Sequence, residues 1–326
     1  MLNLIHSNLY QLAHGKMVYV AFVLLVAYFG LTAYSNFQSS QPEGIAQMEQ
    51  DLAQLKQEDA EPESIVQMEQ TIHAFKTHTF DGGYTDADLV GIAPGGLLSA
   101  ILCVLTALLC YQDFSAGFAK SQLSALVGHQ MSGAHSPAGR GSYYAAKLAT
   151  IAIMDAVFLT ITVTLAIASN AILGFTVSDP EPAWQVAAWT LLTWLFLCGY
   201  TFAAAAITWA ERNQAVGVVG ALLLGSQALE GIMQLALSSG VQLFPGTVIA
   251  AALDVIAAWL PTVSTNILLG GTPALFSTAN GGLWEAAAQA LSLTAHPLTH
   301  VIVTALGFLA LGLVVVFLGC RRRDVA

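Results

Sequence analysis

A glutamate stands inside a long apolar run of the sequence, "QAVGVVGALLLGSQALEGIMQLAL" from Gln214. A carboxylate is expensive in hydrocarbon, so an ionisable residue in such a run commonly lies on the path of a transported substrate or ion. Glu230 is therefore a candidate for a translocation path. The alternative is a hydrogen bond to a neighbouring span, for example through Gln227 or Gln234.

A second acid, Asp155, lies about two turns into the apolar run that begins at Leu148. It is a further candidate for the translocation path. Because it lies close to the end of its run, it could instead be structural. Its expected partners in that case are Lys147 on the same helix or Arg212.

The sequence lacks motifs for covalent or metal chemistry. It has no G-x-x-x-x-G-K-[ST] phosphate loop, no G-x-S-x-G elbow and no H-E-x-x-H motif. His296 and His300 have helical metal-site spacing, but Pro297 interrupts the turn and no third ligand accompanies them, which favours an interfacial pair. The four cysteines show no CxxC spacing. We expect no catalytic residue, no metal site and no cofactor bound by this chain.

Composition places these residues in a membrane protein. Hydrophobic residues make up 56% of the 326 positions and charged residues only 9%, whereas a soluble domain has about 25% charged residues. Runs of about 20 apolar residues predict membrane-spanning helices. The six runs are 17–36, 92–111, 148–174, 183–209, 214–238 and 298–320. Residues 245–297 contain a further apolar region with Asp254 and Pro261, which we interpret as a re-entrant segment followed by an outer loop.

The basic residues predict the orientation, because cytoplasmic loops are enriched in lysine and arginine. With six spans both termini lie on one side, and eight of the ten basic residues fall there. These are Lys16, Lys120, Arg140, Lys147, Arg212, Arg321, Arg322 and Arg323. We therefore expect a cytoplasmic N-terminal interfacial helix over residues 1–16 and a cytoplasmic tail over residues 321–326.

The acidic charge is concentrated in residues 37–91, the first outer loop. Residues 38–90 hold eleven Asp and Glu but only two Lys, so the rest of the chain is almost neutral. "GIAQMEQ" from Gly44 recurs as "SIVQMEQ" from Ser64, with apolar residues at helical spacing, and Pro62 lies in the connector. This pattern predicts two amphipathic helices folded as a hairpin. The hairpin could be a solvated cap, or a gate or docking surface for a cationic peptide.

Residues 112–147 form the predicted cytoplasmic stretch between the second and third spans. After Asp113, apolar residues including Phe114, Phe118 and Leu123 fall mostly on one side of a helix, which Gly128 would end. Such a helix could anchor the loop at the membrane surface or present a docking face to a partner.

An acid after the second span is followed by a glycine and a lysine, with more basic residues before the third span. These are Asp113, Gly117 and Lys120, then Arg140, Tyr144 and Lys147. Together with "WLPTVSTNILLGG" from Trp259, the N-terminal "LNLIHSNLYQLAHGKM" and the terminal "CRRRDVA", this pattern resembles the membrane subunit of an ABC-2 type transporter.

The resemblance implies a separate ATP-binding subunit, which would hold ATP and Mg and contact the loop between the second and third spans. The ATPase-coupling residues it implies are Asp113, Phe114, Gly117, Phe118, Lys120 and Leu123, with Arg140 and Lys147 on the return. It also implies a second permease copy or a homologous permease, and the small residues of "GVVGALLLGS" suit close helix packing.

The sequence therefore predicts an all-α membrane protein with six transmembrane helices, cytoplasmic termini, a cytoplasmic coupling helix and an extracellular helical hairpin. Its predicted function is that of a non-enzymatic permease subunit of an ABC exporter in a bacterial cell membrane, with no nucleic-acid partner. Hydrophobic or amphipathic peptides, including antimicrobial ones, are the first substrate class, followed by drugs and lipids. The alternatives are a membrane-anchored sensor with an acidic ligand-binding ectodomain and a secondary transporter.

Overall fold

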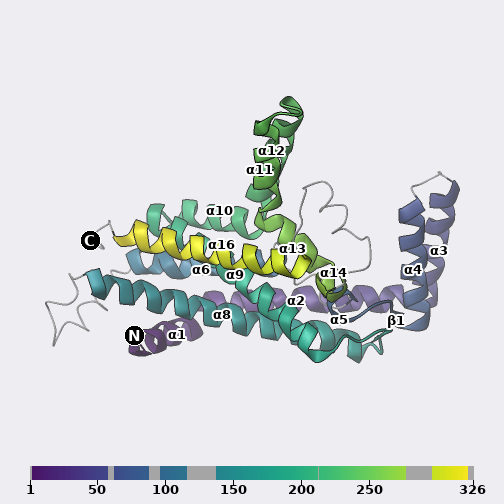
Figure 1. Cartoon of the computed structure of the whole chain (residues 1–326). Helices are drawn as coiled ribbons and strands as arrows, with labels where there is room; N and C mark the ends of the chain where they lie inside the picture. The colour runs from purple at the N-terminus through teal and green to yellow at the C-terminus, as the bar shows by residue number, and fades with distance from the viewer. Residues whose placement is uncertain are drawn as a thin grey trace.

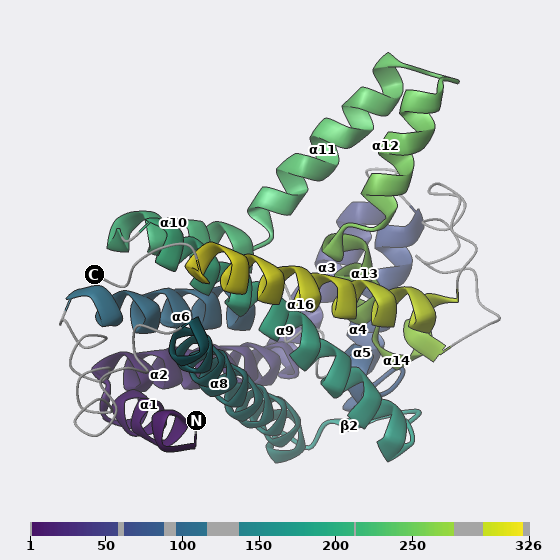
Figure 2. The same cartoon turned by 60° about the vertical axis from the view of Figure 1, so that its left-hand side comes forward.

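Long helices lying along one another form the body of the protein (Figure 1). The computed structural model describes residues 2–57, 62–87, 96–115, 137–211, 213–276 and 296–321. The body contains α2 (Lys16–Ser39), α6 (Leu97–Ser115), α8 (Pro137–Ile172), α9 (Ala183–Glu211) and α16 (Pro297–Arg321). Both chain termini lie toward one end of it, and a pair of helices, α3 (Pro42–Gln57) and α4 (Pro62–Thr77), stands at the other (Figures 1 and 2). We call these the terminal end and the hairpin end.

Four described helices are long and apolar enough to cross a membrane: α2, α8, α9 and α16. Two further helix pairs meet the same criteria together but are bent. α10 (Gln214–Gly225) and α11 (Ala228–Leu243) meet at 62°, and α12 (Val248–Ala258) and α13 (Pro261–Leu269) meet at 48°. The described chain therefore has four candidate spans, or up to six if each bent pair is one span, and α6 is a shorter apolar helix.

The helices coincide with the expected spans to different degrees. α2, α9 and α16 cover the expected spans 17–36, 183–209 and 298–320, and α1 (Leu2–His14) covers the expected N-terminal helix. α6 covers most of the expected span 92–111 and continues to Ser115. α8 includes nearly all of the expected span 148–174 but starts at Pro137, so the end of the expected loop 112–147 is helical. Proline suits the first turn of a helix, where its missing N–H costs no hydrogen bond.

The expected span 214–238 contains a bend, because α10 ends at Gly225 and the chain turns before α11. Gln227 adopts a left-handed conformation with φ 57°, which cannot continue a right-handed helix. The expected re-entrant and outer region 245–297 contains α12, α13 and α14 (Gly271–Phe276). Residues 277–295 of that region lie outside the described chain.

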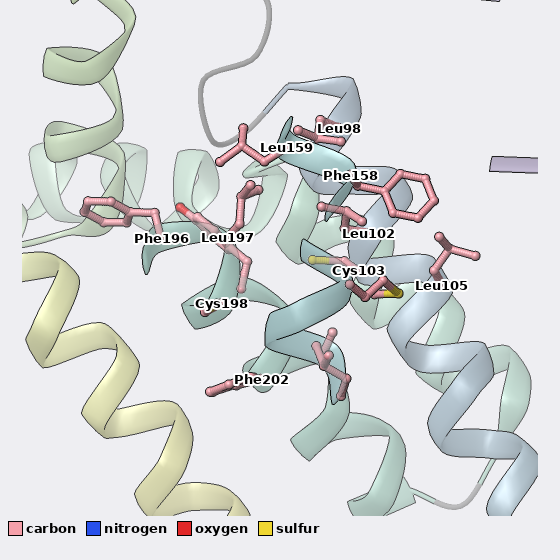
Figure 3. Packing of buried hydrophobic residues seen from close by; sticks show 14 of the residues in the cluster. Leu98, Leu102, Cys103, Leu105, Phe158, Leu159, Phe196, Leu197, Cys198 and Phe202 are labelled. Carbon is pink, nitrogen blue, oxygen red and sulfur yellow. The ribbon is translucent and has the colours of Figure 1, made fainter. Parts of the chain in front are cut away.

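α9 is the centre of the body and packs against α16, α10, α6 and α8. Figure 3 shows the core where α6, α8 and α9 meet, formed by apolar side chains that include Leu102, Cys103, Phe158, Leu159 and Leu197. Helix approach is close here: a Cβ atom added to Gly199 would lie 2.5 Å from the ring of Phe308 on α16. α9 is therefore the element against which the other spans are positioned.

α3 and α4 form the acidic hairpin. The expected apolar stripes are half-buried or buried, while most other positions on both helices are exposed. The stripes consist of Ile45, Met48, Leu52 and Leu55 on α3 and Ile65, Met68, Ile72 and Phe75 on α4. Ion pairs join the two helices, between Lys56 and Glu69 at 2.7 Å and between Lys76 and Glu49. Apolar packing along the stripes holds the hairpin together, because exposed ion pairs contribute little.

The base of the acidic hairpin is attached to the connector between α8 and α9. β1 (Thr79–Phe80) pairs in parallel with β2 (Thr176–Val177). The ring of Phe175 stacks on Phe80 at 4.9 Å and meets Phe75 edge-on at 5.7 Å. The hairpin is thus joined to the end of α8 by backbone pairing and aromatic packing.

Candidate functional site

Glu230 lies in the first turn of α11, directly after the bend, and is only 6% exposed. Its Oε2 accepts a hydrogen bond from the hydroxyl of Tyr200 on α9 at 3.1 Å. The backbone N–H of Thr262, in the first turn of α13, donates to the same carboxyl group. A buried carboxyl group needs such donors. The side chain thus bonds to two neighbouring helices, whereas its role in a translocation path stays a prediction.

Gln227 occupies the bend itself and joins three helices. Its Nε2 donates to the Tyr200 hydroxyl at 3.0 Å and to Oγ1 of Thr265 on α13 at 2.8 Å. The expected link between Gln227 and Glu230 therefore exists, but it runs through Tyr200. Gln234, the other expected partner of Glu230, is exposed.

The second bend, between α12 and α13, is bridged by His300 of α16. Its Nε2 lies 3.0 Å from the carbonyl oxygen of Ala258, the last residue of α12, and its Nδ1 lies 3.1 Å from Oγ of Ser264 on α13. The ring of Trp259, at the bend, stacks on His300 at 4.7 Å. The His300 side chain is fully buried, and the interfacial position of the pair His296 and His300 stays a prediction.

Asp155 is buried in the core between α8 and α9. Its Oδ2 accepts a hydrogen bond of 2.7 Å from the hydroxyl of Thr201, the neighbour of Tyr200. Its Oδ1 is buried without a hydrogen-bond partner, and the thiol of Cys198 lies beside the group. Thr201 takes the place that the sequence suggested for Lys147, and Arg212 lies outside the described residues. The adjacent residues Tyr200 and Thr201 thus hold the two acids of the apolar runs on different sides of α9.

Asp155, Tyr200 and Gln227 lie in one stretch of the chain that is similar to a known protein family. Residues 134–227 match the ABC-2 family transporter protein family. The match spans α8, α9 and α10 and ends at the bend, and it confirms the predicted resemblance to an ABC-2 type permease. Searches of curated proteins and of solved structures gave no match.

The predicted coupling residues are placed only in part. Asp113 and Phe114 lie in the last turn of α6, and Arg140 lies in the first turn of α8. Gly117, Phe118, Lys120 and Leu123 lie outside the described residues. Lys147 is fully buried in α8, beside Tyr144, whose ring packs on Trp209 of α9 at 4.9 Å. Lys147 therefore belongs to the packed terminal end of the body, and its part in coupling stays a prediction.

Glu181, just before α9, forms a polar joint at the hairpin end that sequence reasoning missed. Its Oε1 accepts hydrogen bonds from the N–H of Thr85 at 3.0 Å and from the hydroxyl of Thr272 at 2.9 Å. The Thr85 hydroxyl and the N–H of Tyr84 also donate to this carboxylate. Partial burial opposes ionisation, but the hydrogen bonds from Thr85 and Thr272 outweigh it and hold the pKa of Glu181 below its ordinary value. The joint ties α5 (Tyr84–Ala87), α9 and α14 together.

The polar groups of these sites are joined to neighbouring helices by hydrogen bonds. Within the described ranges, no group of three His, Cys, Asp or Glu side chains could hold a metal ion. Tyr200, Thr201 and Thr265 were missed because hydroxyl residues in an apolar run give no signal of their own. The run "CGYTF" from Cys198 places two hydroxyl groups side by side in a predicted span, and this was the available signal.

Proposed function

We propose that this chain is the permease subunit of an ATP-driven ABC exporter in a bacterial cell membrane. A separate ATP-binding subunit holds ATP and Mg, and a second permease copy or a homologous permease completes the translocation path. The match of residues 134–227 to the ABC-2 family carries this proposal. The candidate spans and the missing phosphate loop support it, because a permease of this kind takes its energy from a partner.

The geometry of α8 supports a coupling role for residues 113–128 and for the return that contains Arg140 and Lys147. α8 is one uninterrupted helix of 36 residues, about 54 Å long at about 1.5 Å per residue. A bilayer core is about 30 Å thick, so α8 crosses it and still extends beyond. A push on the loop before α8 acts on a rigid element that reaches the base of the acidic hairpin.

Both ends of the coupling stretch enter the same packed core. α6 precedes it and α8 follows it, and both helices pack against α9. Movement of a docked ATP-binding subunit would therefore displace α6 and α8 together relative to α9. Asp155 and Glu230 bond to adjacent residues of α9, which supports a role for both acids in responding to this displacement along the translocation path.

The charge of the acidic hairpin supports hydrophobic or amphipathic peptides, including antimicrobial ones, as the first substrate class. Drugs and lipids are the further substrate classes. Glu43 and Asp51 are exposed on α3, and the hairpin carries more acids than its two lysines neutralise. A surface with one sign of charge raises the local concentration of oppositely charged ligands. On the outer side of the membrane, the hairpin would attract a cationic peptide near the exit of the path.

Co-purification with the ATP-binding subunit tests the proposal. The full chain, solubilised in mild detergent, is expressed with an ATPase that contains a phosphate loop and is encoded next to it. Phe118→Asp puts a charge on the apolar face of the predicted coupling helix and should release the ATPase. Val66→Asp makes the same kind of change on the acidic hairpin, where Val66 is 51% exposed, and should leave the complex intact.

Loss of the complex in Phe118→Asp, with the complex retained in Val66→Asp, is the expected result. If Phe118→Asp and replacement of residues 114–127 both leave the complex and its ATPase activity unchanged, the coupling assignment is wrong. If no ATPase co-purifies with the unsubstituted chain, the transporter assignment itself fails.

A further inference from the structure

α11 and α12 form an arm that projects sideways from the body of the protein (Figures 1 and 2). α11 packs mainly against α12, and its other packing partners are α10 and α13, next to the bends. Large apolar side chains on both helices face outward, including Leu235, which is 69% exposed, and Val248, which is 87% exposed. Within the described part of the chain, few contacts therefore hold the arm at its angle, apart from those at its base.

The base consists of the two bends, and hydrogen bonds at each bend reach α13. Gln227 at the first bend reaches Tyr200 and Thr265, and Glu230 reaches Tyr200 and the start of α13. At the second bend, His300 bridges the end of α12 and Ser264 of α13. α13 provides partners at both bends: Thr262 and Thr265 at the first and Ser264 at the second. Both ends of the arm are therefore fixed to the same short helix.

The backbone at the first bend is strained. Gln227 has φ 57° and ψ 12°, a left-handed conformation that side chains with a Cβ atom rarely adopt. Such a conformation persists where surrounding contacts enforce it, and it is common where a protein switches between states. Here the enforcing contacts are the two hydrogen bonds of the Gln227 side chain to Tyr200 and Thr265.

We propose that the α11–α12 arm is hinged at its two bends and takes more than one angle to the body, with Gln227, Tyr200 and Glu230 as the latch that holds the bent position. Release of the latch lets the arm turn at Gln227 and at Trp259 while the rest of the fold stays in place. A use of this movement to open and close the translocation path rests on the proposed function. The hinge itself does not, because it can be measured without an ATP-binding subunit.

Spin labels measure the angle of the arm in the full chain reconstituted in lipid nanodiscs. One label replaces the exposed Ser239 on α11 and the other replaces Val303 on α16, which is 48% exposed. Cys103, Cys110 and Cys198 are buried and stay in place, and Cys320 is changed to serine. A second pair of labels, at Leu191 of α9 and Val303, reports on the body alone; Leu191 is 54% exposed.

Two variants release the latch in different ways, and a third variant serves as the control. Gln227→Leu removes both hydrogen bonds at the bend, and Tyr200→Phe removes only the hydroxyl group that joins Gln227 to Glu230. Gln234→Leu makes the same glutamine-to-leucine change at an exposed position of α11. At about 1.5 Å per residue, Ser239 lies roughly 18 Å beyond Gln227, so a turn of about 30° moves it by roughly 9 Å.

The expected result is a second distance between labels 239 and 303 in Gln227→Leu and in Tyr200→Phe. For a turn of about 30° it differs from the first by up to roughly 9 Å, at about 1.5 Å of helix per residue. The distance between labels 191 and 303 should stay unchanged, and Gln234→Leu should match the unsubstituted chain. If both latch variants keep a single, unshifted distance, packing alone fixes the arm and the proposal is wrong. It is equally wrong if the 191–303 distance shifts by as much in Tyr200→Phe, since the body and not the hinge has then given way.

Discussion

Two threonines of α9 allow the contribution of the Asp155 hydrogen bond to be measured with one kind of substitution. Thr201 and Thr193 are both fully buried on the same helix. The Thr201 hydroxyl lies 2.7 Å from Asp155 and 2.9 Å from the carbonyl oxygen of Leu197. The Thr193 hydroxyl is buried without a hydrogen-bond partner. Thr→Val keeps the branched shape and removes only the hydroxyl group, so the two variants differ in the bond that is lost.

The expected effects have opposite signs. Thr201→Val removes the hydroxyl donor of the buried carboxyl group and leaves beside it the thiol of Cys198, which is a weak donor. A hydrogen bond inside a membrane protein contributes about 0.6 to 1.7 kcal/mol, and a buried group left unpaired costs about 1 to 3 kcal/mol, so a loss of about 2 kcal/mol is expected. Thr193→Val replaces a desolvated hydroxyl with a methyl group and should stabilise the protein by about 1 kcal/mol.

Thermal unfolding of the purified chain in detergent, followed by intrinsic fluorescence, gives the comparison. Thr201→Val should lower the apparent midpoint and Thr193→Val should raise it. The double variant Asp155→Asn with Thr201→Val is the further control. Loss of the Thr201 hydroxyl should cost less stability when residue 155 carries an amide than when it carries a carboxyl group. Equal destabilisation by both single variants would refute the reasoning, since the cost would then follow from packing and not from the hydrogen bond to Asp155.

The hairpin end gives two further predictions. Glu181→Gln should speed hydrogen exchange at the amides of residues 82–87 by about 30-fold, because a loss of about 2 kcal/mol corresponds to that factor. The exposed control Asp179→Asn should leave these exchange rates unchanged. Equal rates in both variants would contradict a role for Glu181 in holding the joint. The folded state holds the pKa of Glu181 below its ordinary value of 4.5. The carboxylate therefore stabilises the joint fully above pH 4.5, and the joint should loosen as the pH falls through the folded-state pKa. Glu181→Gln should abolish this pH dependence. Phe75→Ala removes a ring packed on Phe80 and Phe175 and should speed hydrogen exchange in α4 at least tenfold, since the loss of a buried phenylalanine costs about 3 kcal/mol or more. The exposed control Val66→Ala should leave exchange in α4 unchanged. Similar exchange rates in the two variants would show that other contacts hold the base of the hairpin.

Much of the architecture follows from local pattern. Apolar length predicts α2, α9 and α16, and the repeated spacing around Met48 and Met68 predicts both helices of the acidic hairpin and the faces they bury. These features depend on residues within a few turns of one another. The start of α8 at Pro137 was missed because glycine and serine around Arg140 favour a loop when taken by themselves.

The bends and joints depend on partners that are distant in the sequence, which is why local pattern fails there. "GSQALEG" from Gly225 is compatible with a continuing helix, and Gln227 is left-handed where Tyr200 and Thr265 accept its amide group. Glu181 lies in "SDPEPAW", which is typical of a solvated loop, until Thr85 and Thr272 approach it from two other segments. A buried polar group is satisfied by whichever donors the fold brings near it. The sequence therefore identifies Asp155 and Glu230 as ionisable residues in apolar runs. Their partners on α9 follow only from the packing of the fold, in which Tyr200 reaches α11 and Thr201 reaches α8.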